Sequence, residues 1–273
     1  WPKGRALNLQ RQDRRIFEKL IRFLDKKKTS AKIPDQLMLE IGRFFLGTPY
    51  AGGTLETKGA EHLVINLREL DCVTFVEKIV ALALYLKTQE KSYEAFRIIL
   101  QKIRYRQGRL QGYSSRLHYF SDWIHDNQKK GIVRDVTAEI GGRSLRKTIN
   151  FMTKNPNLYP PLKNVANFRK MKSVEKTISR RSLYLIPKRA LRRLEDRIRD
   201  GDLIAITTNA EGLDVKHVGL ATRVKNRIHL LHASSTEGKV VLSKKTLYRY
   251  LMQSRARSGI MVARVRSARR GNS

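Results

Sequence analysis

The segment from Asp71 to Lys87 constrains the fold more than any other part of this sequence. It is almost entirely apolar, with Val73, Phe75, Val76, Ile79, Val80, Leu82, Leu84 and Leu86. A helix with apolar residues on every side is typical of a protein interior, so we expect this segment to be the buried central helix. The longest unbroken apolar run, Ile79 to Leu86, is far shorter than the roughly 20 residues that cross a bilayer, and we expect no transmembrane segment.

Helical patterns dominate the first half of the chain, and strand patterns dominate the last third. Apolar spacing predicts further helices over 11–28, 34–45 and 93–104, with an irregular loop over 47–70. Short β-branched runs predict strands over 202–208, 215–222, 228–233, 239–242 and 259–265. This order favours an α+β fold with an antiparallel sheet packed on the central helix. We expect one domain over 47–273 with an elaborated middle (about 110–200), and basic helices of residues 1–46 packed on it.

The net charge limits the classes of partner. The chain has 57 Lys and Arg against 24 Asp and Glu, which leaves +33. A field of this sign attracts polyanions. The basic residues are spread along the chain, with denser patches at 11–28, 178–199 and 264–270, and the sequence has no zinc-finger, helix-turn-helix or RNP motif. We therefore expect contact with anionic polymers and no specific nucleic acid.

The single cysteine lies at a position that chemistry can use. Cys72 follows Asp71, a good N-cap residue, in the first turn of the predicted central helix. Backbone N–H groups and the helix dipole favour a thiolate there, which makes Cys72 a candidate nucleophile. The alternative is a buried cysteine that only packs. One cysteine excludes an internal disulfide and a Cys-cluster metal site, and we expect no metal and no cofactor.

Two histidines fall on neighbouring predicted strands. Strand alternation places His217 on the same face as Gly219 and Ala221, which leave space beside its ring. His232 alternates with Ile228 and Leu230 and therefore points inward. A cysteine at a helix start, a histidine on a strand and a polar partner on the next strand are typical of a nucleophile, its base and an orienting residue. Taken alone, His217 has the alternative of a half-buried strand histidine bonded to backbone, and a lone histidine at position 232 is more often a hydrogen-bonded core residue.

The segment from Arg116 to Trp123 has two interpretations. In the first, the segment binds a sugar ring: the platform consists of Tyr119, Phe120 and Trp123, and the polar contacts come from Arg116, His118 and Asp122. In the second, the aromatic side chains belong to the core.

Several motifs together resemble the NlpC-type cysteine peptidases of bacterial cell walls, and within them the N-acetylmuramoyl-L-alanine amidase-like branch. The resemblance covers roughly residues 40 to 265. Its motifs are Gly47-Thr-Pro-Tyr50, Leu70-Asp-Cys72-Val-Thr-Phe-Val-Glu77, Gly201-Asp-Leu-Ile-Ala-Ile-Thr-Thr208, Leu213-Asp-Val-Lys-His217-Val-Gly219, Leu230-Leu-His232-Ala-Ser-Ser235, Arg116-Leu-His118-Tyr-Phe-Ser-Asp122-Trp123-Ile and Asn150-Phe-Met-Thr153.

The resemblance implies a papain-like fold in which the Cys-bearing helix packs on an antiparallel sheet or partial barrel. It implies Cys72 as nucleophile, His217 as general base and His232 as the orienting residue. It places Tyr50 near the nucleophile and makes Asp71 a substrate contact. It also favours binding over a core role for Arg116, His118, Asp122 and Trp123.

The implied reaction is hydrolysis of the amide between the muramoyl lactyl group and L-alanine in peptidoglycan fragments. Many endopeptidases of the superfamily have Ser and Gly after Asp-Cys, where this chain has Val73 and Thr74. This departure favours the amidase branch over a stem-peptide endopeptidase, which stays as an alternative. A basic nucleic-acid-binding protein and a catalytically inactive wall-binding module are alternatives from other classes.

The resemblance also implies a periplasmic or cell-envelope location, where the positive charge would hold the protein on anionic envelope polymers. Residues 1–30 contain no apolar segment typical of a signal peptide, so we expect any export signal to have been removed.

Overall fold

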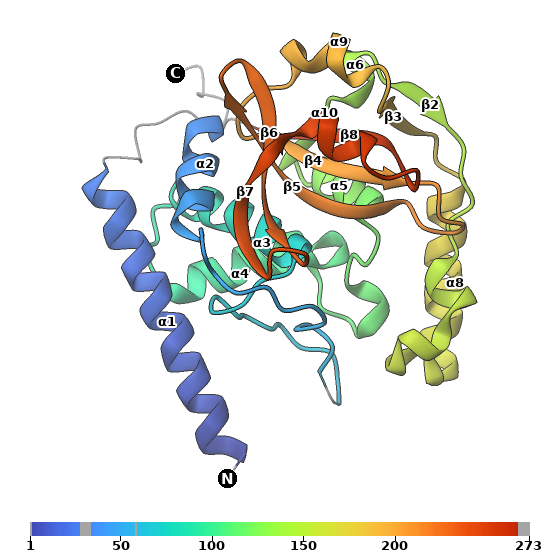
Figure 1. Cartoon of the computed structure of the whole chain (residues 1–273). Coiled ribbons are helices and arrows are strands. Elements are labelled where there is room, and N and C mark those ends of the chain that lie inside the picture. Colours follow the sequence, from blue (N-terminus) through green and yellow to red (C-terminus); the bar gives the residue numbers. More distant parts are fainter. Residues whose placement is uncertain (1, 28–33, 58, 267–273) are drawn as a thin grey trace, which may run out of the picture.

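An antiparallel sheet and the helices that cover it organise the chain (Figure 1). The computed structural model describes residues 2–27, 34–57 and 59–266. The strand order is β2-β3-β8-β4-β5-β6-β7, and β1 also pairs with β8. The strands are β1 (Val133–Asp135), β2 (Arg143–Leu145), β3 (Leu183–Pro187), β4 (Leu203–Thr208), β5 (Val215–Val224), β6 (Arg227–Ser234), β7 (Lys239–Thr246) and β8 (Arg257–Val265).

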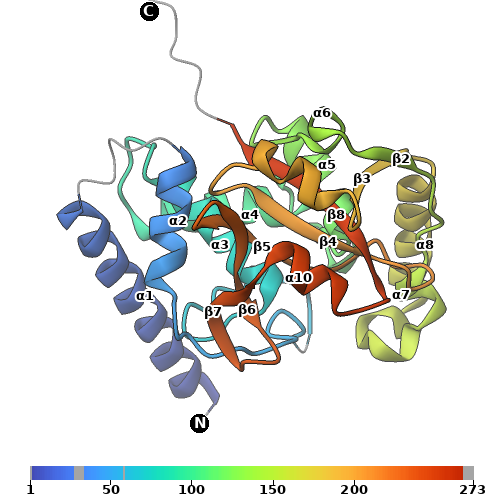
Figure 2. The ribbon, with the colours of Figure 1, turned by 45° about the horizontal axis from the view of Figure 1, so that its top comes forward.

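The longer helices lie at the two ends of the sheet and across its faces. The α-helices are α1 (Pro2–Lys26), α2 (Pro34–Phe44), α3 (Cys72–Tyr85), α4 (Tyr93–Arg104), α5 (Phe120–Lys129), α6 (Thr137–Ile140), α7 (Phe151–Lys154), α8 (Val165–Ser179), α9 (Leu191–Leu194) and α10 (Leu247–Met252). The short 3-10 helices are η2 (Arg106–Gly108), η3 (Tyr113–Ser115), η4 (Pro156–Leu158), η5 (Pro160–Lys163) and η6 (Glu195–Arg197). In both ribbon views α1 and α8 lie on opposite sides of the molecule (Figures 1 and 2).

The predicted α+β class and antiparallel sheet are confirmed, and the five predicted strands correspond to β4 to β8. The prediction missed the middle strands β1, β2 and β3, two of which have only three residues and so carry little period. The helix predicted from residue 11 begins earlier in the structure, at Pro2. The prediction missed its first turns because the apolar residues there do not follow the helical spacing. Residue 28 and the basic tail beyond residue 266 lie outside the described residues.

The main core lies between α3 and one face of the sheet. From Thr74 to Ala83 every side chain of α3 is buried, as its apolar composition predicts. Phe17, Leu20 and Leu24 of the basic helix α1 belong to the same core. On the other face of the sheet, Leu247 and Leu251 of α10 pack into a second core (Figure 2). The sheet is therefore covered on both faces.

Both charged residues of α3, Glu77 and Lys78, are buried. Arg104 Nε lies 2.7 Å from Glu77 Oε2, and both side chains are almost fully buried. Burial and the charge of Arg104 lower the pKa of Lys78 to about 7.

Among the described residues, no helix combines the length and the apolar character that a membrane crossing requires.

Candidate active site

Cys72 is the first residue of α3, and a capping box fixes its backbone. Asp71 Oδ1 accepts a hydrogen bond from the Thr74 backbone N–H at 2.7 Å, and the Asp71 backbone N–H donates to Thr74 Oγ1 at 3.0 Å. This reciprocal pair closes the first turn of the helix. Thr74, which departs from the motif of the wall endopeptidases, is thus the residue that completes the cap.

The sulfur of Cys72 lies against backbone N–H groups, yet the thiol is neutral. The N–H groups of Val218, Val73 and Cys72 itself hydrogen-bond the sulfur and lower its pKa. Burial, and then the charge of Asp71, outweigh them and raise the pKa to about 12. Burial therefore opposes the resting thiolate that the helix start was expected to favour, because loss of solvent disfavours the anion.

His217 and His232 form one hydrogen-bonded pair. His217 Nε2 lies 2.6 Å from His232 Nδ1, and the two rings meet edge to face with centroids 4.7 Å apart. Gly219 makes this approach possible, because a Cβ there would lie 2.9 Å from His232 Cβ. The predicted space beside the ring is thus filled by the second histidine. The hydrogen bond leaves His217 Nδ1 as the nitrogen available to another group.

A register shift in β5 aims the His217 side chain. Ile206 pairs with His217 while Thr207 pairs with Val215, so β5 contains one extra residue between them. Such a bulge re-aims the side chains that follow it. The next residue, Val218, packs on the α3 side of the sheet and hydrogen-bonds the Cys72 sulfur through its N–H. The bulge therefore brings the backbone beside His217 onto the nucleophile.

Both histidines are neutral. Burial, the charge of His232 and that of Arg257 lower the pKa of His217 to about 3. Burial and Arg257 lower the pKa of His232 to about 4. Each ring would gain its proton only well below the ordinary range of histidine. Near neutral pH the site therefore holds a neutral thiol and two neutral imidazoles.

Tyr50 lies next to the segment that leads into α3. Its backbone N–H donates to Gly238 O at 2.8 Å, and it bridges to Leu70 just before the start of α3. Burial, followed by the charges of Cys72 and Asp71, raises the pKa of the phenol. The half-buried ring is thus a neutral wall close to the sulfur.

Tyr250 and Arg257 complete the surroundings of the histidines, and sequence reasoning missed both. The Tyr250 ring centroid lies 5.8 Å from that of His232 and 6.3 Å from that of His217. Burial raises the pKa of the Tyr250 phenol. The Arg257 guanidinium lies 3.9 Å from the Tyr250 ring centroid. Neither residue belongs to a recognisable motif.

Asp214 anchors the start of the His217 strand and was also missed. Its Oδ2 accepts from the Ser121 backbone N–H and its Oδ1 from that of Val215, both at 2.7 Å. Burial raises the pKa of this carboxyl. Asp214 therefore ties the first turn of α5 to the strand residue that lies two positions before His217.

Arg116 and His118 have their polar groups occupied by the protein. The Arg116 guanidinium pairs with Glu56 at 2.6 Å and Glu61 at 3.3 Å. His118 Nε2 lies 2.8 Å from the Tyr113 carbonyl oxygen, and burial lowers the pKa of its ring. Neither contact involves Cys72 or the histidine pair. The structure thus places both residues in a separate internal network rather than at the nucleophile.

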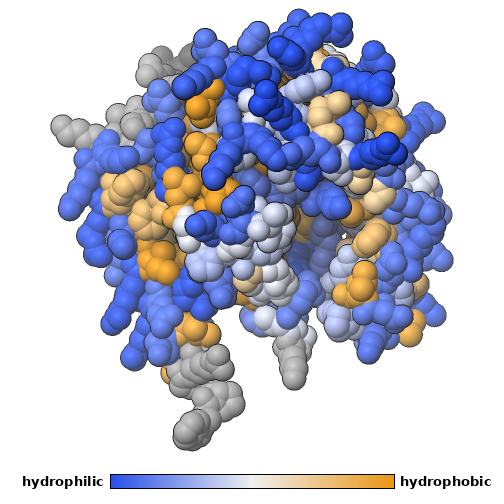
Figure 3. All heavy atoms as spheres, viewed as in Figure 1, coloured by the Kyte–Doolittle hydropathy of each residue, from blue (hydrophilic) through white to orange (hydrophobic). Residues whose placement is uncertain are grey.

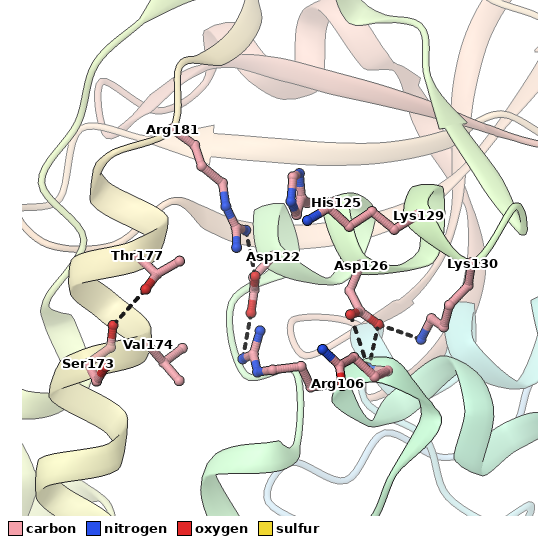
Figure 4. A pocket seen from close by; sticks show the side chains of 11 residues that line it. Arg106, Asp122, His125, Asp126, Lys129, Lys130, Ser173, Val174, Thr177 and Arg181 are labelled. Carbon is pink, nitrogen blue, oxygen red and sulfur yellow. Dashed lines mark hydrogen bonds and ion pairs between the residues drawn. The ribbon is translucent and has the colours of Figure 1, made fainter.

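Asp122 and Trp123 are also internal. The Trp123 side chain is fully buried and stacks on Phe120 with ring centroids 5.0 Å apart, so the core interpretation describes its position. Asp122 accepts a hydrogen bond from Arg181 at 2.6 Å and forms an ion pair with Arg106 at 2.7 Å, and all three residues line a cavity of about 460 Å³ between α5 and α8 (Figure 4). We call these three residues the Asp122 cluster.

A second cavity, of about 680 Å³, lies between the loop that follows Tyr50 and the residues before α8. Glu56, Thr57 and Gly59 line one side, and Pro160, Lys163 and Asn167 line the other. The mostly hydrophilic surface is hollowed on this side of the molecule (Figure 3). Within residues 2–27, 34–57 and 59–266, no group of three His, Cys, Asp or Glu side chains is arranged to hold a metal ion.

Comparisons with solved structures find close relatives over most of the chain. An N-acetylmuramoyl-L-alanine amidase from Bacteroides uniformis is 42% identical, with a TM-score of 0.82 over 86% of this chain and 99% of that one. A Bacteroides fragilis protein described provisionally as a xylanase is 43% identical, with a TM-score of 0.78 over 82% and 98%. A Legionella pneumophila protein, 23% identical with a TM-score of 0.73 over 96% and 97%, shares the fold.

The sequence comparison identifies the family. No curated protein matches significantly. The family model described as N-acetylmuramoyl-L-alanine amidase-like matches residues 40–260, which include α3, both histidines and most of the sheet. The chain belongs to the N-acetylmuramoyl-L-alanine amidase-like family.

Proposed function

We propose that this protein is a cysteine amidase that cleaves the bond between the muramoyl lactyl group and L-alanine in peptidoglycan fragments. One observation supports the mechanism most directly. Cys72, at the start of α3, accepts a hydrogen bond from the backbone of Val218, next to a histidine pair joined at 2.6 Å. Nucleophile, base and orienting residue therefore come together from α3, β5 and β6.

The first half of the reaction forms a thioester. The thiol proton of Cys72 passes to His217 Nδ1 as the sulfur attacks the lactyl carbonyl carbon. The resulting imidazolium then gives this proton to the departing alanine nitrogen, and the C–N bond breaks. The low pKa of His217 makes its imidazolium a strong acid, which suits the protonation of a poor leaving group. A lactyl thioester on Cys72 and a peptide with a free amine result.

The second half restores the enzyme. His217 takes a proton from water, the hydroxide oxygen attacks the thioester carbonyl, and the thiolate leaves and regains the proton. In this scheme His217 carries hydrogen on Nε2 and donates it to His232 Nδ1, which fixes the tautomer. The N–H groups at the start of α3 are the proposed donors to the negative oxygen of the tetrahedral intermediate.

The choice of bond rests on the family and on its relatives. A relative of 42% identity is named as an N-acetylmuramoyl-L-alanine amidase. The xylanase description of another relative does not suit this site, because glycoside hydrolysis uses a pair of carboxylates flanking the bond. The groups that we assign to this site are instead one thiol and a hydrogen-bonded pair of imidazoles. A thiol and two imidazoles fit acyl transfer.

We extend the proposal to the fold lineage and the location. A helix that starts with the nucleophile and packs on an antiparallel sheet carrying the histidines supports a papain-like fold of the NlpC type. A peptidoglycan substrate implies a periplasmic or cell-envelope location. The net charge of +33 then serves to hold the protein on anionic envelope polymers.

Product analysis tests the reaction. A defined muropeptide mixture is incubated with wild type, Cys72→Ala and His217→Ala, with the exposed His62→Ala as the matched control. Mass spectrometry should detect muramic-acid sugars with a free lactyl carboxylate and peptides beginning with L-alanine, from wild type and control alone. Release of stem dipeptides with the muramoyl amide intact would move the enzyme to the endopeptidase alternative. Sequence-selective DNA binding at physiological salt, without muropeptide cleavage, would contradict the enzyme proposal.

A further inference from the structure

One arginine in the active site has no acidic partner. Among the described residues no carboxylate forms an ion pair with Arg257, although most other buried or half-buried arginines near polar clusters have one. Its Nη1 instead donates to the backbone carbonyl of Tyr250, and its guanidinium carbon lies over the Tyr250 ring, 3.9 Å from the centroid. The charge is thus fixed in position and is not neutralised by a neighbour.

The Tyr250 ring connects this charge to the histidines. Tyr250 lies in the last turn of α10, whose unpaired carbonyl groups attract a cation. Its ring meets His232 edge to face at 72° and lies tilted by 38° against His217. Arg257 begins β8, so α10 and β8 are held together at one point beside the active site.

We propose that Tyr250 and Arg257 are a positioning pair, which holds the two imidazoles through the ring and keeps a fixed positive charge beside them. The proposal rests on the cysteine-amidase function and deepens it by assigning control of the base. The pair does not touch the reacting atoms. Its effect passes through His217 and His232.

The charge selects the protonation state that the reaction needs. The groups that act on the imidazoles are each other and Arg257, while Tyr250 and, beyond it, Cys72 are the other titratable groups at the site. A neighbouring cation disfavours a second proton on either ring, so the base stays free and His232 stays an acceptor. The same cation makes the transient imidazolium a stronger acid toward the leaving amine.

Replacement of the charge tests the electrostatic part. In Arg257→Gln we expect the acid limb of kcat/KM to move up by about one pH unit and kcat to fall about tenfold, with KM little changed. The midpoints of the His217 and His232 ring protons in NMR titrations should move up as well, and this readout does not depend on activity. Arg257→Lys keeps the charge and should restore the pH profile, although part of the loss in kcat should remain.

A matched control separates position from net charge. Arg249→Gln removes the same charge from an exposed position on α10, the helix that carries Tyr250, and its pH profile should equal that of wild type. If Arg257→Gln leaves both the acid limb and the histidine midpoints unchanged, the proposal is wrong. It is equally wrong if Arg257→Lys moves them as far as Arg257→Gln does. Loss of the amidase function itself has a different signature, namely no cleavage in wild type.

Discussion

The active site and the Asp122 cluster both bury polar groups, but they treat them in opposite ways. In the Asp122 cluster one carboxylate takes two guanidinium groups at 2.6 and 2.7 Å, so opposite charges meet directly (Figure 4). In the active site a thiol and two imidazoles are kept neutral, and the cation of Arg257 has no counter-ion among the described residues. The cluster contains satisfied ions, while the site contains groups that can still exchange a proton.

This difference shows why a cluster of buried charged residues does not by itself identify a reactive site. Ion pairs in the interior offset the cost of burial and leave no reactive group. Neutral groups with strongly shifted pKa values, held in contact, retain their reactivity and cluster at functional sites. Changes in the two regions should therefore have separable effects, on activity in one and on stability in the other.

The largest effect is expected at the nucleophile. Cys72→Ala should lower the rate of muropeptide cleavage at least about ten-thousandfold, because no other described side chain of the site supplies a nucleophile. The melting temperature should stay close to that of wild type, since the capping box of α3 uses Asp71 and Thr74 rather than the sulfur. Rates and thermal melts are measured on the same preparation. Appreciable cleavage by Cys72→Ala would remove the distinction between the two regions.

The second effect concerns the protonation state of the thiol. With its pKa raised to about 12, alkylation of Cys72 by iodoacetamide should become about tenfold faster per pH unit from pH 6 to 9. A resting thiolate–imidazolium pair would instead react at a rate that is nearly flat over this range. A flat profile would mean that the active site, like the Asp122 cluster, contains paired ions.

The third effect is on stability. Asp122→Ala leaves Arg106 and Arg181 without their shared carboxylate and should cost about 3 kcal/mol of unfolding free energy. Asp196→Ala removes a carboxylate at the surface and should change it by less than about 0.5 kcal/mol. Urea unfolding measures both. If Asp122→Ala keeps its stability and raises KM instead, Asp122 binds substrate, as the sequence predicted.

The smallest effect is expected at the orienting residue. His232→Ala should lower kcat about thirtyfold, less than loss of Cys72 or His217, because His232 acts only through the His217 tautomer. His232→Asn offers a carbonyl oxygen as acceptor and should recover part of the loss. Equal defects in both variants would mean that His232 has a different role.

The sequence predicted the parts of the site that depend on local period. The buried run after Asp71 predicts the helix that begins with Cys72, and the two-residue alternation predicts that His217 and His232 share a face beside Gly219. A distance from Cys72 to the strands could not be predicted, because it depends on the packing of α3 on the sheet. The periodic pattern of apolar residues is therefore sufficient to predict where a residue lies within one element and on which face of the neighbouring strand.

The remaining features depend on contacts between distant segments. Arg257 reaches the histidines only because β8 lies beside β4 and α10 folds over the sheet, and neither contact leaves a local pattern. Asp122 looks like a binding residue in a sequence, but Arg106 and Arg181 approach from other segments and pair with its carboxylate. The raised thiol pKa likewise follows from burial in the folded chain, which the N-terminal helix position does not reveal.

Direct detection of the acyl-enzyme tests the central claim, that Cys72 and the histidine pair cleave a muramoyl amide through a thioester. A muropeptide reaction is quenched in acid within the first turnovers, and the protein is digested and analysed by mass spectrometry. The account predicts a muramoyl mass added to the peptide that contains Cys72, which disappears with hydroxylamine and is absent from Cys72→Ala. Full turnover with no adduct at any time point, together with cleavage by Cys72→Ala, would contradict it.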